Sequence, residues 1–153
     1  MPPHGPGLLG AAHSHDPNFP DDNWNLYSML DTSQTTALNV TVNENVIGIF
    51  KPHVHRLDDE PQIISDSDAE VIIVARFTSP VHLRKLMIIG GGSSEHHPKE
   101  MKVFTGHEGI DFTNVSSYRP VETFTIPVNE PGTCEVSFCK IVATPALMFA
   151  TII

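Results

Sequence analysis

Two histidines and a glutamate in the first half of the chain form the arrangement best suited to metal chemistry. His53 and His55 are two residues apart, and Glu60 follows a short charged run. In an extended strand, residues two apart project from the same face. The two imidazoles could therefore hold one metal ion, with the Glu60 carboxylate as a third ligand.

The surroundings of the histidine pair favour a loop instead. A His-x-His pair followed by an acid is similar to the metal motif of the cupins, which are jelly rolls, but the glycines of that motif are absent here. Pro52 and the charges that follow the pair favour an exposed loop or edge. His96, His97 and His107 are further ligands only if the fold brings them close. We therefore expect no metal and keep a metal-dependent jelly-roll enzyme as an alternative.

Two other groups of residues have weaker metal-binding patterns. Asp66, Asp68 and Glu70 alternate as calcium ligands can, yet the glycine and distal glutamate of a helix-loop-helix site are missing, so we expect a solvated acidic turn. Cys134 and Cys139 are too few for a zinc site or a disulfide framework. We expect two reduced thiols and no cofactor.

The charge of the chain excludes several classes of partner. Eighteen acidic residues against nine basic ones give a formal net charge of -9, which disfavours nucleic acid and anionic membranes. No stretch approaches the roughly 20 apolar residues of a membrane helix, and the N-terminus lacks the features of a signal peptide. We expect a soluble intracellular protein, in which the glycosylation sequons at Asn39 and Asn114 are chance matches.

The elements that must position these residues are short strands. Residues 1–24 are rich in Pro, Gly and His and predict a flexible tail, and residues 24–30 predict one helical turn. Apolar runs separated by turn signals then predict strands over 46–50, 62–65, 71–77, 81–89, 101–105, 123–126, 135–142 and 147–153. Seven or eight strands without crossover helices indicate an antiparallel sandwich or jelly roll.

The segment 81–89 illustrates the expected burial. Ser79-Pro80 predicts a turn before it. Alternation then places four apolar side chains on one face. Leu86 and Ile88 join His82 and Arg84 on the other face, which we therefore expect to become buried partway along the strand. The four side chains are those of Val81, Leu83, Met87 and Ile89.

Several motifs, in order, resemble one known family. They are Ile49-Phe50-Lys51-Pro52, Ile64-Ser65-Asp66-Ser67-Asp68-Ala69-Glu70, Met87-Ile88-Ile89-Gly90 and His97-Pro98-Lys99-Glu100-Met101. Together they resemble the PITH domain, the module named for proteasome-interacting thioredoxin-like proteins, over about residues 26–128. The chain departs from the family pattern after about Val136. We therefore predict a flexible tail over 1–24, a PITH domain over 25–138 that is incomplete at its C-terminus, and a divergent segment over 139–153.

The resemblance implies a galactose-binding-like jelly-roll sandwich, in which the departure predicts that C-terminal strands are missing or replaced. It also implies a non-enzymatic protein-interaction module in the cytoplasm and nucleus, associated with the proteasome regulatory particle, and we expect a monomer. A small-ligand or sugar-binding sandwich is a further alternative. The sole tryptophan, Trp24, precedes the domain and offers it no stacking platform.

Overall fold

The computed structural model describes residues 25–41, 46–58, 60–89 and 97–127, together with the backbone of residues 133–152. The predicted tail over 1–24 lies outside the described residues. In the described part every helix is a single 3-10 turn: η2 (Leu26–Met29), η4 (His53–His55) and η5 (Val115–Ser117). The helical turn expected after Trp24 is therefore confirmed as η2, which Asn25 caps by accepting a hydrogen bond from the Tyr27 N–H.

Five antiparallel strands build the part of the chain that the structure describes, so the all-β prediction is confirmed. They are β1 (Thr36–Leu38), β2 (Glu70–Ile89), β3 (Glu100–Thr105), β4 (Glu122–Thr125) and β5 (Thr133–Ile152). Their order in the sheet is β1-β2-β5-β3-β4. The last strand in sequence therefore lies at the centre, between β2 and β3.

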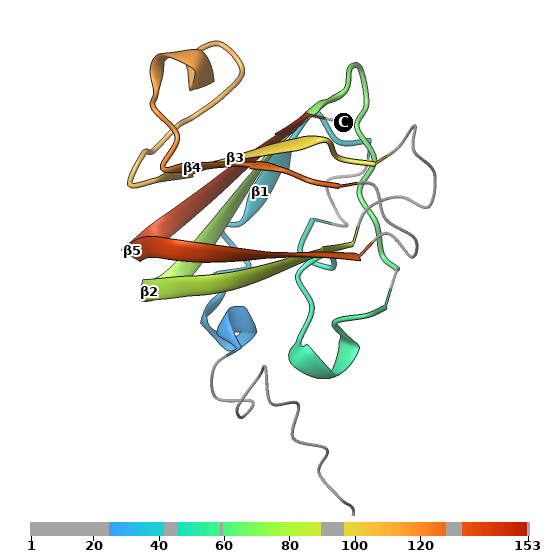
Figure 1. Cartoon of the computed structure of the whole chain (residues 1–153), viewed down its shortest axis with the longest axis vertical. Coiled ribbons are helices and arrows are strands. Elements are labelled where there is room, and N and C mark those ends of the chain that lie inside the picture. The colour runs from blue at the N-terminus through green and yellow to red at the C-terminus, as the bar shows by residue number, and fades with distance from the viewer. Residues whose placement is uncertain (1–24, 42–45, 59, 90–96, 128–132, 153) are drawn as a thin grey trace, which may run out of the picture.

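The long strands β2 and β5 bend together at one corner. They pair from Glu70–Ile152 to Ile89–Thr133, but residues 77–80 of β2 stand opposite Pro145 alone. Pro80 and Pro145 both lack the N–H that a ladder requires, so pairing lapses on both strands at this point. Figure 1 shows the paired ribbon folding back here, so that its two halves form two layers.

This corner corrects the prediction of two separate strands joined by a turn at Ser79-Pro80. The chain does change direction there, but it stays in β2 and keeps β5 as its partner on both sides. The strands predicted over 135–142 and 147–153 are likewise the two halves of β5. Among the described strands, the second half of β2 pairs with β5 alone.

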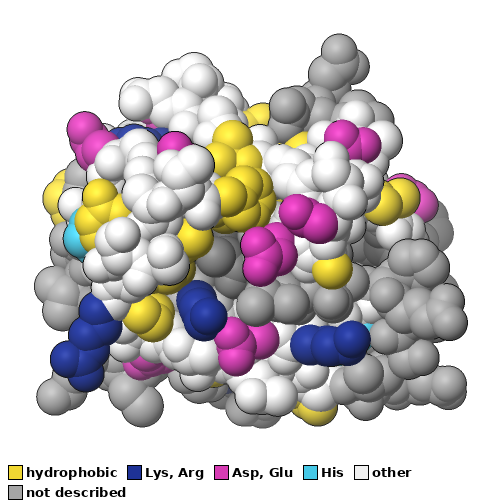
Figure 2. All heavy atoms as spheres, turned by 90° about the horizontal axis from the view of Figure 1, so that it is seen from above, with side chains coloured by type: hydrophobic (Ala, Val, Ile, Leu, Met, Phe, Trp, Pro, Cys, Tyr) yellow, Lys and Arg dark blue, Asp and Glu magenta, His cyan; other side chains and the backbone are white. Residues whose placement is uncertain are grey.

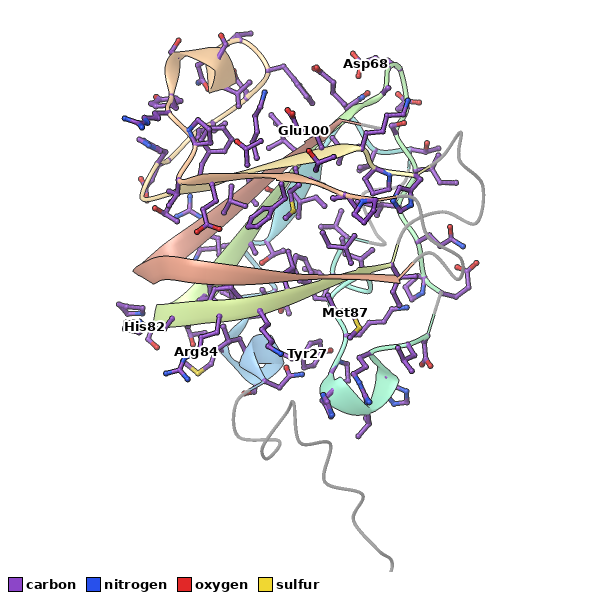
Figure 3. The ribbon with its side chains drawn as sticks, viewed as in Figure 1. Tyr27, Asp68, His82, Arg84, Met87 and Glu100 are labelled. Carbon is purple, nitrogen blue, oxygen red and sulfur yellow. The ribbon has the colours of Figure 1, made fainter. Side chains whose placement is uncertain are left out.

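The space between the two layers is the main core. The buried side chains of β2 and β3 meet the second half of β2, from which Leu83, Leu86 and Ile88 pack against them. Leu86 and Ile88 are partly buried, as expected, but the predicted phase of 81–89 was wrong beyond Leu83, where the register with β5 shifts. Met87 instead lies with His82 and Arg84 on the outer side of this layer (Figure 3).

The opposite face of the five-stranded sheet is also covered. Ile72 of β2 and Phe104 of β3 are buried against Ile110, and Val115 and Tyr118 pack around them. The connection between β3 and β4 therefore forms an outer covering layer. This explains why β2 and β3 are apolar on both faces, as fully buried strands are.

Two of the predicted strands are irregular segments in the structure. Residues 46–50 form turns, in which the Phe50 N–H donates to the Ile47 carbonyl. Their side chains are apolar because they fill the ends of the core: Val46 is buried beside Val71, and Phe50 packs on the main cluster. Segment 62–65 makes one bridge, from Val40 to Ser65. No helix in the described part of the chain is long and apolar enough to cross a membrane.

Candidate functional site

The histidine pair does not have the geometry that the metal alternative requires. His53–Val54–His55 is the 3-10 turn η4 rather than a strand. With three residues per turn, side chains two apart point in different directions. His55 Nδ1 lies 3.0 Å from a carboxylate oxygen of Asp58, whereas Glu60 accepts a hydrogen bond from Gln62 at 3.1 Å. Within the described residues, no three His, Cys, Asp or Glu side chains converge as a metal site.

The other candidate histidines lie apart from this turn. His97 is 1% exposed just before β3, and its Nε2 has no hydrogen-bond partner in the described part of the chain. His107 lies in the covering layer, where its ring centroid is 4.3 Å from that of Tyr118. His96 falls outside the described residues. Cys134 and Cys139 belong to β5, of which the structure describes the backbone.

The acidic turn after Ser65 is organised by Asn39. The Asn39 side-chain amide donates to Asp68 Oδ1 and to the Glu70 carbonyl, both at 2.6 Å, and accepts from the Ser67 N–H at 3.0 Å. Asp68 Oδ1 also accepts from the Glu70 N–H. This carboxylate oxygen is therefore used within the turn, which is a structural role rather than a calcium site.

Asn39 is a residue whose importance our sequence analysis missed. Its φ of 59° places it in the left-handed region, which Asn tolerates better than most residues. The signal was present as an Asn at the end of a short strand. Asn114, in the second sequon, has a similar local role, because its amide donates to the Gly109 carbonyl at 2.9 Å.

Two aspartates form tight turns of the same kind. The Ser33 hydroxyl, together with the Ser33 N–H and Gln34, holds the pKa of Asp31 below its ordinary value. The Thr113 hydroxyl and N–H, with the Asn114 N–H, do the same for the pKa of Asp111. A general acid working near neutral pH needs a raised carboxyl pKa, so both carboxylates have the properties of structural hydrogen-bond acceptors.

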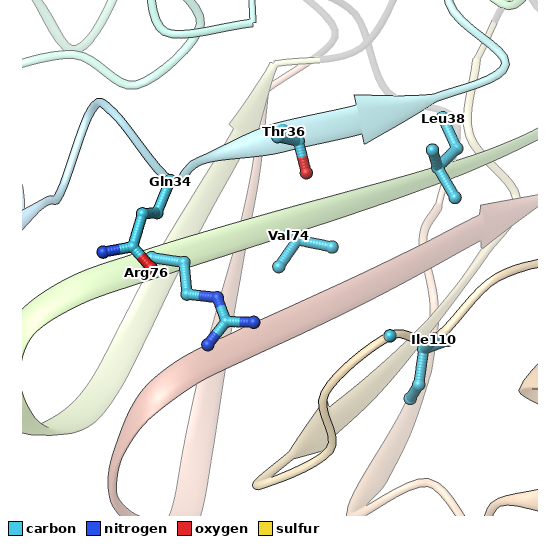
Figure 4. Close-up of a pocket in the computed structure, with 7 residues that line it drawn as sticks. Gln34, Thr36, Leu38, Val74, Arg76 and Ile110 are labelled. Carbon is cyan, nitrogen blue, oxygen red and sulfur yellow. The ribbon is translucent and has the colours of Figure 1, made fainter.

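One surface hollow of the described residues lies on the outer face of the sheet, beside β1 (Figure 4). Its volume is about 200 Å³. Gln34 and Arg76 form one end and Thr36 the middle, and the apolar walls come from Leu38, Val74 and Ile110. Sequence analysis did not identify this hollow, although an arginine within the apolar run 71–77 was a signal of it.

Among the described residues that line this hollow, Arg76 is the one cation. Its guanidinium NH1 lies 3.2 Å from Glu108 Oε1 and its side chain is 23% exposed, whereas the Glu108 side chain is 83% exposed. The Arg76 backbone is fixed on both sides, because its N–H donates to Thr35 Oγ1 and its carbonyl accepts from the Asp31 N–H. The arginine is therefore held in place while its carboxylate partner extends into solvent.

The second hollow separates η2 from η4, also with about 200 Å³. Tyr27 and Ser28 line one side, and Pro52, His53 and Val54 line the other. Val54 is 73% exposed at its edge. On the face seen in Figure 2, acidic and basic side chains are scattered among one another, without a basic patch that would follow a phosphate backbone.

The fold and these surface features define an all-β sandwich domain with a covering loop layer. A family model described as the PITH domain matches residues 16–148. The chain belongs to the PITH domain family, whose domain is a galactose-binding-like β-sandwich. The matched range extends beyond residues 26–128, over which the motifs resemble the family.

Curated relatives carry the same family name. The chain is 36% identical over 112 residues to PITH domain-containing protein 1 of Dictyostelium discoideum, an alignment that covers 71% of this chain and 52% of that protein. It is 28% identical over 134 residues to PITH domain-containing protein 1 of Homo sapiens, with 86% and 62% covered. The chain therefore spans about half to two thirds of the length of these relatives. The division at residue 138 stays a prediction.

Proposed function

We propose that this chain is a non-enzymatic protein-interaction module that associates with the proteasome regulatory particle. The observation that carries the proposal is the match to the PITH domain over residues 16–148. The names of the curated relatives describe a domain and name no reaction. We further propose that the module acts as a monomer in the cytoplasm and nucleus, without a cofactor and without contact to nucleic acid or membrane.

The surface chemistry supports a protein as the partner. The two hollows of about 200 Å³ are smaller than the roughly 300–1,000 Å³ of pockets that enclose drug-sized ligands. Each combines apolar walls with a few polar groups, which suits single side chains of a protein surface. Exposed apolar side chains such as Val54 and Leu57, 73% and 63% exposed, add contact area beside η4.

A pull-down from cell extract tests the proposal. The tagged chain is expected to recover subunits of the proteasome regulatory particle, and full-length human PITH domain-containing protein 1 serves as the matched control. Recovery by the control and none by this chain would overturn the proposal. Activity assays on the purified chain supply a second test, since a turnover traced to its own side chains would contradict a non-enzymatic role.

A further inference from the structure

The hollow beside β1 has the chemistry of a carboxylate site. It places one positively charged group, the Arg76 guanidinium, at the end of a short apolar channel formed by Leu38, Val74 and Ile110. A guanidinium carries five N–H donors, and paired with a carboxylate it can form two parallel hydrogen bonds. The apolar walls suit the aliphatic part of a side chain that ends in such a carboxylate.

The ion pair with Glu108 shows that the Arg76 guanidinium can bind a carboxylate. The Glu108 Oε1 atom takes one Arg76 donor at 3.2 Å, which is longer than the about 2.7–2.9 Å of strong charge-assisted hydrogen bonds. The glutamate side chain is 83% exposed, so solvent screens the pair and its net stability is small. Another carboxylate can therefore replace Glu108 at little cost.

We propose that this hollow, with Arg76 at its end, receives one carboxylate of a protein partner together with the aliphatic group that carries it. The inference rests on the proposed function, because it supposes that the ligand belongs to a protein. The carboxylate comes from an acidic side chain or from the C-terminus of a chain. In the free protein the Arg76 guanidinium is paired with Glu108, which extends into solvent, and in the complex it is paired with the partner's carboxylate.

The charge of the whole chain limits the ligand to a single carboxylate. A net charge of -9 repels a strongly acidic segment. At physiological salt, charges farther away than a Debye length of about 8 Å are largely screened, so once Glu108 is displaced the Arg76 guanidinium is the nearest charge to the ligand. An acidic residue flanked by aliphatic ones fits this field, whereas a polyacidic tract does not.

Three short peptides test the proposal by nuclear magnetic resonance on the isotope-labelled full chain. The first is acetyl-Leu-Glu-Leu-amide, the second replaces its Glu with Gln, and the third is acetyl-Leu-Gln-Leu with a free C-terminal carboxylate. We expect millimolar-range binding of the first or the third, with shifts at Thr36, Arg76 and Ile110. The two carboxylate peptides distinguish a side chain from a chain end. Equal shifts with the capped Gln peptide, or none at these residues with any peptide, overturn the proposal.

Three variants sharpen the test. Arg76→Gln is expected to weaken binding at least about tenfold. Glu108→Gln removes the internal competitor and is expected to tighten binding about two- to fivefold. Thr36→Phe keeps a strand-forming residue at an exposed position and is expected to block the hollow. Lys102→Ala is the matched control, because it removes a cation of the same sheet that is paired with Glu100, away from the hollow.

The outcomes separate this inference from the proposed function. If the unchanged chain recovers proteasome subunits and the peptides do not bind, the hollow is not the site and the module assignment stands. If the peptides bind and no proteasome subunit is recovered, the carboxylate site stands and the partner is a different protein. A Glu108→Gln variant that folds yet binds more weakly than the unchanged chain contradicts competition by Glu108.

Discussion

At the scale of residues, a few polar side chains fix the segments around β1. Asp31 accepts hydrogen bonds from Ser33 and Gln34, and Asn39 connects the end of β1 to the acidic turn before β2. β1 is three residues long, shorter than the usual strand length of about five or six residues, so it makes few ladder hydrogen bonds. Its place in the sheet therefore depends on these two side chains, one on each side.

Replacing Asn39 should separate its backbone role from its hydrogen bonds. Asn39→Gly keeps the positive φ and loses the amide, and we expect a loss of about 1–2 kcal/mol of unfolding free energy. Asn39→Asp should lose more, because a carboxylate cannot donate to Asp68 or Glu70 and repels the Asp68 carboxylate. Urea denaturation measures both. An Asp variant as stable as the Gly variant would contradict this account of the turn.

The turns at Asp31 and Asp111 predict loss of stability in acid. Hydrogen bonds, those from Ser33 and Thr113 above all, lower both pKa values below the ordinary 3.8 in the folded protein. A lowered folded pKa gives stability that is complete above pH 3.8 and is lost as the pH falls through the folded values. We expect the urea concentration at the unfolding midpoint, measured from neutral pH down to pH 2, to decrease once the pH is below about 4. The Asp31→Asn variant should lose less of its stability over this range, and an unchanged pH profile would contradict the prediction.

At the scale of elements, the corner shared by β2 and β5 creates the second layer. Because residues 77–80 face Pro145 alone, the ribbon can fold back without leaving ladder donors unpaired on Pro80 or Pro145. The register shift beyond Leu83 then brings Leu86 and Ile88 to the core. One paired ribbon therefore supplies strands to both layers.

Two substitutions at neighbouring positions test which side chains in the second half of β2 face the core. Leu86→Ala removes a side chain that packs against the main core, and we expect a loss of about 1–3 kcal/mol of unfolding free energy. Met87→Ala, one residue along on the outer side, should cost less. Thermal and urea unfolding measure both variants. A Met87 variant less stable than the Leu86 variant would mean that Met87, and not Leu86, faces the core, as strict alternation along the sequence predicted.

The sequence predicted the strands that are apolar and regular. It did not predict the structure of segments whose conformation depends on tertiary packing. Segments 71–77, 101–105 and 123–126 are strands as expected. Segment 46–50 is apolar because it fills core ends, a role that periodicity cannot separate from a strand. β1 was missed because it has three residues. The arginine within the apolar run 71–77 was a signal of the hollow, but its shape could not be predicted, since it joins residues 34–38, 74–76 and 109–110 through tertiary contacts.

At the scale of the whole molecule, the sheet is enclosed on both faces. Val103 and Phe104 are adjacent in β3, and one is buried in the main core while the other is buried under the covering layer. The connection over 106–121 is therefore part of the folded structure rather than a loose loop. Its packing and the main core can be perturbed separately.

Hydrogen exchange can show this separation. Phe104→Ala should cost about 3–5 kcal/mol and raise exchange first at the amides of 110–118, which pack on Phe104. Val103→Ala should raise exchange in β2 and leave 110–118 protected until the molecule unfolds globally. The same exchange pattern in both variants would mean that the covering layer and the core open as one unit.

The central position of β5 also orders events during synthesis. β1 and β2 leave the ribosome first and β3 and β4 next, yet neither group has its inner neighbour until β5 emerges. β2 and β3 must wait with apolar side chains on both faces, and such long-range pairing is slow to form. Until β5 emerges, the nascent chain therefore presents an unpaired sheet edge to chaperones, and that one strand then joins the two groups in one step.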